Sequence, residues 1–308
     1  MARVFSPDEQ QRVRQSLSYA SRWGGFWYRV VPYRRRVVEE NIQRIFGEFL
    51  SANEQRQLTK AYYHHLASLV WELFAVQYLT NWRKRLNPVA RDAHHFGDAV
   101  RLGKGVLLLT AHTGNWEWGL INTAQHIARE SQCETHFLSR VLRVNWFRNW
   151  RIRRYARNGI TAIENTTGSL RQVLRALRAG QAVIMTIDQH AGAAGASATP
   201  APFFGEMTPT FTTLANIALR TGAPVVPLAV YKDYETKQHG MRFYPALDME
   251  GAAGPDANEA SDATLSKLAG ACNAAFETMI IEHPEQWLWS HRRWRESDCV
   301  AVDSAKTK

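Results

Sequence analysis

Apolar positions in the first hundred residues recur at helical spacing. Serine followed three residues later by glutamate marks two helix starts, at Ser6 and Ser51, and Pro7 occupies the first helical position after Ser6. In the helix after Ser51, apolar and aromatic side chains share one face: Tyr62, Leu66, Leu69, Val70, Leu73 and Phe74. We therefore expect residues 1–100 to form a helical N-terminal region.

From residue 105 the pattern changes to short apolar runs separated by helical segments. The runs predict strands at 106–110, 135–139, 182–187, 225–231 and 242–246. The segments between them predict helices at 115–129, 209–220 and 262–282. Two more helices are expected, an arginine-rich one that ends at Arg157 and one that is capped by Thr166 and Thr167 and ends at Gly180. Loops are expected at 191–201 and 251–260. This alternation predicts an α/β domain at residues 101–300, a mixed sheet flanked by helices, with a helical N-terminal extension and a disordered tail at 301–308.

The charge balance narrows the classes of partner. The chain has 38 Lys and Arg against 28 Asp and Glu, a formal net charge of +10, which favours nucleic acid, anionic lipid or an acidic carrier protein. Nucleic acid fits least, because no recognised binding motif accompanies the charge. The three cysteines lack C-x-x-C spacing, so we expect neither a disulfide framework nor a zinc site, and no cofactor.

Residues 23–36 place aromatic side chains directly before a run of arginines. Two interpretations stay open: this segment lies in the headgroup region of a membrane, or its aromatics pack inward against the next helix. No apolar run is long enough to span a bilayer, and residues 1–14 lack the apolar stretch of a leader. Any membrane contact is therefore expected to be peripheral.

His112 directly follows a predicted buried strand, and Glu117 comes five residues later. On an uninterrupted helix the two side chains would lie about 140° apart, so they meet only if the chain turns between them. Residues 113–115 supply that turn, and Asn115 can cap the next helix. A carboxylate bonded to one ring nitrogen would make the other a stronger base. By spacing alone, a purely structural pair is the more common case.

Residues 111–117 resemble the H-x4-(D/E) signature of the bacterial lipid A biosynthesis (late) acyltransferases, a branch of the glycerolipid acyltransferase group. Further blocks resemble the same family, in the right order from about residue 36 to 295: Asn41 and Phe46 with Glu72, Ser139-Arg140 with Asn145, residues 187–189, 203–210, 221–227 and 283–294. The resemblance implies the glycerolipid acyltransferase fold and an acyltransferase activity.

The resemblance also implies a reaction without a covalent acyl-enzyme. His112 would be the general base on an acceptor hydroxyl that attacks a thioester, and Glu117 would orient and support the imidazolium. The absence of a G-x-S-x-G motif agrees with a missing serine nucleophile. Arg140 would bind a phosphate or the developing oxyanion.

Three more residues are expected at the substrate site: Asn115, Asp188 and Gln189. Asp188 has two open interpretations, an ordinary strand-end cap or a residue that holds an arginine or a loop. Residues 140–157 carry seven arginines, which form either a solvated helix face or a dock for anionic headgroups or for an acidic acyl carrier protein.

Three functions stay open from the sequence. The first is transfer of a fatty acyl group from acyl carrier protein to a hydroxyl of a lipid A-type or related anionic glycolipid or phospholipid, at the cytoplasmic face of the bacterial inner membrane. The second is the same transfer to another acceptor, such as an amino-acid-derived lipid or a secondary metabolite. The third is an inactive peripheral membrane-binding homologue, against which the intact His112 and Glu117 count. Coenzyme A stays open as the donor.

Overall fold

A computed structural model describes residues 3–74, 89–192, 197–236, 238–249 and 261–294. The predicted loop at 251–260 and the predicted tail at 301–308 lie outside the described residues.

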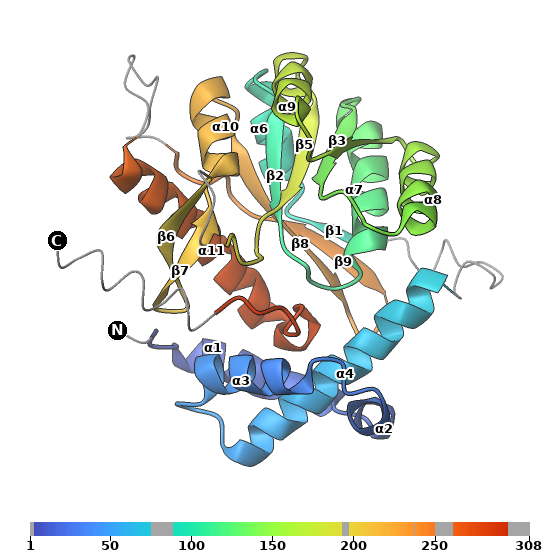
Figure 1. Cartoon of the computed structure of the whole chain (residues 1–308), viewed down its shortest axis with the longest axis vertical. Helices are drawn as coiled ribbons and strands as arrows, with labels where there is room; N and C mark the ends of the chain where they lie inside the picture. Colours follow the sequence, from blue (N-terminus) through green and yellow to red (C-terminus); the bar gives the residue numbers. More distant parts are fainter. Residues whose placement is uncertain (1–2, 75–88, 193–196, 237, 250–260, 295–308) are drawn as a thin grey trace.

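A mixed sheet forms the centre of the α/β part (Figure 1). Its strands are β1 (Val89–Arg91), β2 (Val106–Thr110), β3 (Thr135–Ser139), β4 (Ile160–Glu164), β5 (Ala182–Thr186), β8 (Val225–Lys232) and β9 (His239–Phe243). They lie in the order β1-β9-β8-β2-β5-β3-β4, and β2 is parallel to both of its neighbours, β5 and β8. The sheet is mixed because β9 runs antiparallel to β8.

Alternate residues of the central strands point to two different cores. Leu107 and Val183 join the core that contains helices α9 (Ser169–Arg178), α10 (Thr213–Thr221) and α11 (Asp262–Glu282). Leu108 and Ile184 join the core that contains α6 (His94–Arg101), α7 (Trp116–Ser131) and part of α8 (Asn145–Ala156). Both faces of the sheet are therefore covered, as the continuous apolar runs predict.

Among the described residues before the sheet there are four helices, α1 (Pro7–Ser16), α2 (Arg22–Val30), α3 (Arg35–Phe46) and α4 (Ala52–Phe74), with a short 3-10 turn at Leu17–Tyr19. They lie together below the sheet in Figure 1, and α4 rises from them along one side. The capping box predicted at Ser6 is present, and Ser51 accepts from the Glu54 N–H in the same way.

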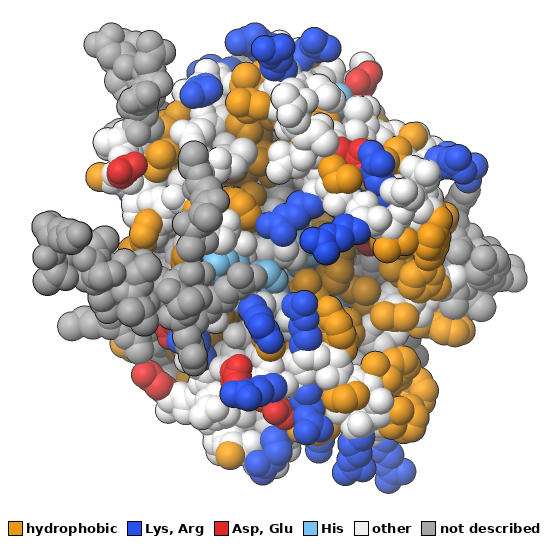
Figure 2. All heavy atoms as spheres, viewed as in Figure 1, with side chains coloured by type: hydrophobic (Ala, Val, Ile, Leu, Met, Phe, Trp, Pro, Cys, Tyr) orange, Lys and Arg blue, Asp and Glu red, His pale blue; other side chains and the backbone are white. Residues whose placement is uncertain are grey.

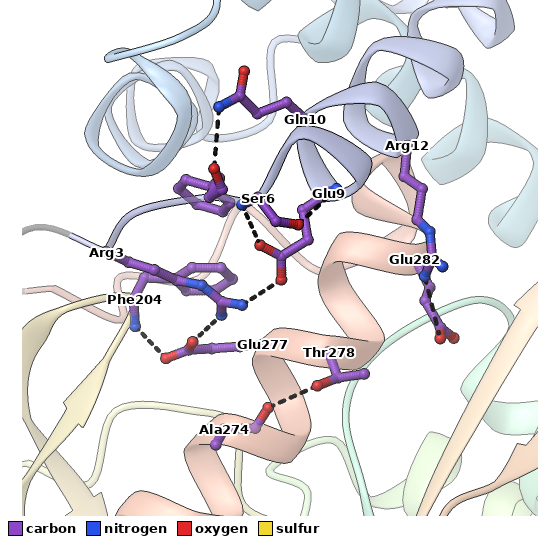
Figure 3. Close-up of polar contacts among 11 residues, drawn as sticks. Arg3, Ser6, Glu9, Gln10, Arg12, Phe204, Ala274, Glu277, Thr278 and Glu282 are labelled. Carbon is purple, nitrogen blue, oxygen red and sulfur yellow. Dashed lines mark hydrogen bonds and ion pairs between the residues drawn. The ribbon is translucent and has the colours of Figure 1, made fainter.

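The start of the chain is tied to α11 by ionic contacts (Figure 3). The Arg3 guanidinium bridges the carboxylates of Glu9 and Glu277, and Glu277 also accepts the Phe204 N–H. Arg12 pairs with Glu282 one turn further along α11, at 3.8 Å. The helical extension is thus fastened to the α/β part by contacts between residues about 270 positions apart.

The structure confirms the α/β class, the mixed sheet flanked by helices and the helical N-terminal region. It corrects one region: a hairpin of β6 (Ala198–Phe203) and β7 (Glu206–Phe211) stands where a loop and a helix beginning at Pro209 were expected. Pro209 pairs with Pro200 across this two-stranded ribbon, where a missing N–H costs little at an edge.

Other boundaries also differ from the predictions. The strands β1 and β4 were not predicted, and β9 begins three residues before the expected Arg242. Helix α9 begins after Gly168, which has a positive φ of 94° and no side-chain cap, so Thr166 and Thr167 do not cap it. Among the described residues no helix has both the length and the apolarity needed to cross a bilayer.

Candidate active site

Strand register brings His112 and Asp188 together. The last residues of the parallel neighbours β2 and β5, Thr110 and Thr186, are register partners. His112 and Asp188 each follow two residues later, so both lie at the carboxyl edge of the sheet, where α/β proteins bind ligands. His112 Nδ1 lies 2.8 Å from Asp188 Oδ1, and its main-chain N–H donates to Oδ2 at 2.9 Å. One carboxylate therefore fixes both the ring and the backbone of His112.

The buried carboxylate sets the protonation of the imidazole. Asp188 is 2% exposed and also accepts the Trp287 indole N–H at 2.9 Å. Burial raises the pKa of Asp188, but the charge and hydrogen bonds of His112 outweigh it and lower this pKa to about 2. For His112, burial lowers the pKa, because it disfavours the charged ring. The Asp188 carboxylate outweighs this effect, so the pKa of His112 lies above its ordinary value.

Because an ionised carboxylate only accepts, Nδ1–H of His112 donates to Asp188 and Nε2 is left as the basic nitrogen. The His112 side chain is 22% exposed and lies edge-on to the Trp116 ring, with 5.3 Å between ring centroids. Figure 2 shows histidine side chains in the middle of one face, with Lys and Arg side chains gathered above and below them. The partly exposed His112 side chain can therefore be reached from solvent.

The prediction that the Glu117 carboxylate bonds to the imidazole is wrong. Glu117 lies in the first turn of α7, but its Oε2 accepts the Tyr155 hydroxyl at 2.8 Å and its Oε1 lies 3.9 Å from Arg151. Its charge still raises the pKa of His112, after the larger contributions of Asp188. The partner that orients the ring comes from the neighbouring strand, because the turn after His112 sends Glu117 toward α8.

That turn depends on Gly114 and Asn115. Gly114 has a φ of 54°, and a Cβ there would meet the Val230 carbonyl oxygen at 2.5 Å. Asn115 caps α7 as predicted, accepting the Trp118 N–H at 3.2 Å. Asn115 is 1% exposed and its amide also donates to Glu72. Its side chain therefore shapes the turn, whereas the sequence predicted that it would contact a substrate.

A buried ionic cluster from the helical extension holds this turn. The Glu72 carboxylate, on α4, accepts hydrogen bonds from Asn115 Nδ2 at 2.9 Å and from Lys232 Nζ at 2.5 Å. It also lies 3.3 Å from His239 Nε2. Burial would raise the pKa of Glu72, but His239 and Lys232 lower it to about 2, so the side chain is ionised. The sequence resemblance pointed to Glu72, whereas its partners could not be read from the sequence.

Two helical turns earlier on α4, His65 also supports this turn. Its Nε2 donates to the Gly114 carbonyl at 3.2 Å, and its Nδ1 accepts the Tyr234 hydroxyl at 3.0 Å. Burial lowers the pKa of His65 to about 3, so the ring stays neutral and can play both roles. The helical extension thus contacts the turn after His112 from two positions of α4 that lie about two helical turns apart.

Residues 283–294, which we call the C-terminal segment, also contact the site. The Leu288 N–H donates to the His112 carbonyl at 3.0 Å, and His291 Nε2 accepts the His190 N–H at 2.8 Å. Asn41, on α3, donates to the carbonyls of both Trp289 and His291 at 2.8 Å. The sequence resemblance marked this segment, and the structure shows that it contacts the backbone of His112.

Arg140 and Gln189 both line a cavity of about 360 Å³ beside the sheet edge. The rest of its described lining is mixed: serine, threonine and asparagine side chains alternate with the apolar residues Leu138, Leu170, Val173, Met185, Ile187, Phe211 and Ile217. Arg140 lies over the Phe211 ring, 5.7 Å from its centroid, and its charge lowers the pKa of His112. The structure therefore brings Arg140 and Gln189 to one cavity, and the charge of Arg140 acts on His112.

The chain matches the family of bacterial lipid A biosynthesis acyltransferases over residues 14–296, and it belongs to this family. The match includes the helical extension, the sheet and the closing segment. No curated protein matches the chain. The family identifies the protein as an acyltransferase.

Asp188→Asn removes the charge that raises the pKa of His112 and allows the wrong tautomer. We expect kcat/KM to fall by roughly 10²-fold to 10⁴-fold. His112 must be neutral to act as a base, so the rate rises with pH through its pKa. The acidic limb of the pH–rate profile should therefore move to lower pH in the variant. Glu117→Gln is the matched control, with a smaller shift in the same direction. A limb that moves more in Glu117→Gln than in Asp188→Asn would contradict the assignment.

Glu72→Gln leaves the mostly buried Lys232 ammonium without its carboxylate. We expect a loss of about 3 to 5 kcal/mol in the free energy of unfolding, measured by denaturant titration at neutral pH. The folded pKa of Glu72 lies below its ordinary value of 4.5, so its contribution is complete above 4.5 and disappears as pH falls toward 2. The variant should lack this part of the acid sensitivity.

Glu40→Gln serves as the control, because Glu40 makes an exposed i,i+4 pair with Arg36 worth about 0.5 kcal/mol. Equal effects of the two substitutions would show that the Glu72 cluster is energetically unimportant.

Proposed function

We propose that this acyltransferase moves a fatty acyl chain from acyl carrier protein to a hydroxyl of a lipid A-type glycolipid, with His112 as the general base. The observation that carries the proposal is the imidazole held by Asp188 through Nδ1, in a side chain that is partly exposed. A base of this kind suits proton abstraction from an alcohol near neutral pH.

The reaction proceeds by direct transfer. Nε2 of His112 takes the proton of the acceptor hydroxyl while that oxygen bonds to the thioester carbonyl carbon. The carbon–sulfur bond then breaks, the thiolate leaves, and the imidazolium returns its proton to the sulfur. Asp188 stabilises the imidazolium throughout, and Arg140 stabilises the negative oxygen that forms on the carbonyl. The products are an ester and a free thiol.

The cavity that Arg140 lines suits the acyl chain of the donor through its apolar lining residues. Its volume of about 360 Å³ falls within the usual range for ligand pockets, and its apolar walls lie between β5, α9 and α10. A chain in this cavity would place its thioester beside Arg140 and the sheet edge. The length that the cavity accommodates would then select the donor.

Helix α8 offers a docking surface for the acidic carrier. Three of its arginines are engaged within the protein: Arg148 with Glu164, Arg151 with Ser139, and Arg154 over Trp118. Arg153 and the adjoining Arg157 are exposed. The arginine run is therefore neither wholly structural nor wholly free, and its exposed members suit a carrier with a complementary charge.

The direct test is an acyl-transfer assay followed by mass spectrometry. Purified protein is incubated with acyl carrier protein and coenzyme A thioesters of several chain lengths, and with lipid A-type, phospholipid and amino-acid-derived acceptors. We expect an acylated glycolipid from the carrier-protein donors, loss of transfer in His112→Ala, and an unchanged circular dichroism spectrum. His136→Ala is the control for removing an imidazole. Normal transfer by His112→Ala would exclude His112 as the base. Faster transfer to a phospholipid or to an amino-acid-derived acceptor would show that the glycolipid is not the acceptor.

Two apolar surfaces lie on one side of the molecule (Figure 2), and we propose that they contact the inner membrane. On α2, Trp23 is 55% and Phe26 49% exposed, whereas Trp27 packs against the core, so only part of this aromatic segment packs inward. On α4, Trp71 is 58% and Phe74 47% exposed. Exposed aromatics beside arginines suit the headgroup region of an anionic membrane.

A double substitution Trp23→Ser/Phe26→Ser should weaken sedimentation with phosphatidylglycerol vesicles severalfold, since most of the exposed aromatic area of α2 is lost. The matched control is Met207→Ser, which removes a 41% exposed apolar side chain from the β6–β7 hairpin. Equal vesicle binding by the double variant and the wild type would show that α2 is not the membrane contact.

A further inference from the structure

A second cationic site lies in a groove between α3, the β6–β7 hairpin and the C-terminal segment. We call it the arginine groove. It has a volume of about 1330 Å³, and the charged residues among its described lining are Arg34, Arg35, Arg36, Arg44, Arg292, Glu40 and Glu206. Five guanidinium groups therefore face two carboxylates.

Internal pairing uses only part of this positive charge. Glu40 accepts Arg36 Nε at 2.6 Å, and Glu206 accepts Arg44 Nη1 at 2.8 Å. The other three arginines keep their charge largely available. Each carboxylate of the groove is thus committed to one arginine, and an excess of three positive charges is left for a ligand.

The three remaining guanidinium groups have weak partners or none. Arg34 donates to the neutral Ser290 carbonyl at 3.2 Å, and Arg35 approaches Glu39 only to 3.8 Å. In the part of the chain that the structure describes, Arg292 has no hydrogen bond or ion pair. Arg34 also has a φ of 51°, the left-handed region that a residue with a Cβ rarely adopts. Backbone strain of this kind concentrates at ligand sites.

The groove and the catalytic base share one stretch of chain. Leu288 donates its N–H to the His112 carbonyl, and Arg292 follows four residues later. Four residues span at most about 14 Å, so the groove lies within the reach of a sugar phosphate from the base. Arg34 donates to the Ser290 carbonyl and Asn41 to the Trp289 carbonyl, both in the stretch between Leu288 and Arg292. These bonds fix the groove relative to His112.

We propose that the arginine groove binds a phosphate group of the acceptor and so presents a neighbouring hydroxyl to His112. This inference rests on the proposed function. A phosphomonoester carries a charge of about −1.5 to −2 at neutral pH, and guanidinium groups bind its oxygens in pairs. The excess charge of the groove matches one such group. Arg140, on the other side of the site, is then free to serve the thioester.

The test uses the double variant Arg35→Gln/Arg292→Gln, which removes two exposed guanidinium groups without orphaning a buried partner. The acceptors are a phosphorylated lipid A-type glycolipid and the same lipid after phosphatase treatment. We expect KM for the phosphorylated acceptor to rise roughly tenfold or more, with kcat little changed. KM for the dephosphorylated acceptor should be the same in variant and wild type. Arg175→Gln/Arg178→Gln on α9, equally exposed, is the control.

Equal changes in KM with both acceptors, or no change with either, would overturn the proposal. Calorimetric titration of the full chain with inorganic pyrophosphate needs no turnover: wild type should bind and the double variant should not. Pyrophosphate binding without transfer to any acceptor would retain the groove as a phosphate site and reject the proposed function. If the double variant instead loses binding to phosphatidylglycerol vesicles as strongly as Trp23→Ser/Phe26→Ser, the ligand is a bilayer headgroup and the acceptor assignment is wrong.

Discussion

The hydrogen bonds between His112 and the Asp188 carboxylate are the constraint on which the rest of the site depends. They exist because β2 and β5 are adjacent, parallel and in register, with each partner two residues beyond its strand. The cost of burying the Asp188 charge is offset by the His112 ring, the His112 main-chain N–H and the Trp287 indole. This arrangement keeps the carboxylate ionised and makes the histidine a stronger base than a solvated one. The same bonds leave Nε2 as the basic nitrogen of the neutral ring.

Around this pair, the surrounding elements restrict where the backbone of His112 can go. The helical extension contributes Glu72 and His65, which bind the side chain of Asn115 and the carbonyl of Gly114. The C-terminal segment contributes the Leu288 N–H. The helical extension and the closing segment are therefore as much parts of the site as the sheet itself, which is consistent with a family match that covers nearly the whole chain.

The sequence predicted His112, the strands that carry it and the family, because apolar runs and ordered motif blocks are local signals. It assigned the wrong carboxylate, because proximity along the chain favoured Glu117 over Asp188, 76 residues away. The equal two-residue offset of His112 and Asp188 from predicted parallel strands was a usable signal for the pair. The contact between Glu72 and Lys232 had no such signal, since nothing in either segment specifies a partner 160 residues distant. The hairpin was missed because Pro209 fits both a helix start and an edge strand.

The most direct test of the account is nitrogen-15 NMR of the His112 imidazole across pH, with the signal assigned by comparison with His112→Ala. We expect a proton on Nδ1 and none on Nε2 in the neutral ring, and a pKa above the ordinary histidine value of 6.5. In Asp188→Asn that pKa should fall below the wild-type value. A neutral ring protonated on Nε2, or a pKa that Asp188→Asn leaves unchanged, would contradict the claim that Asp188 prepares His112 as the base.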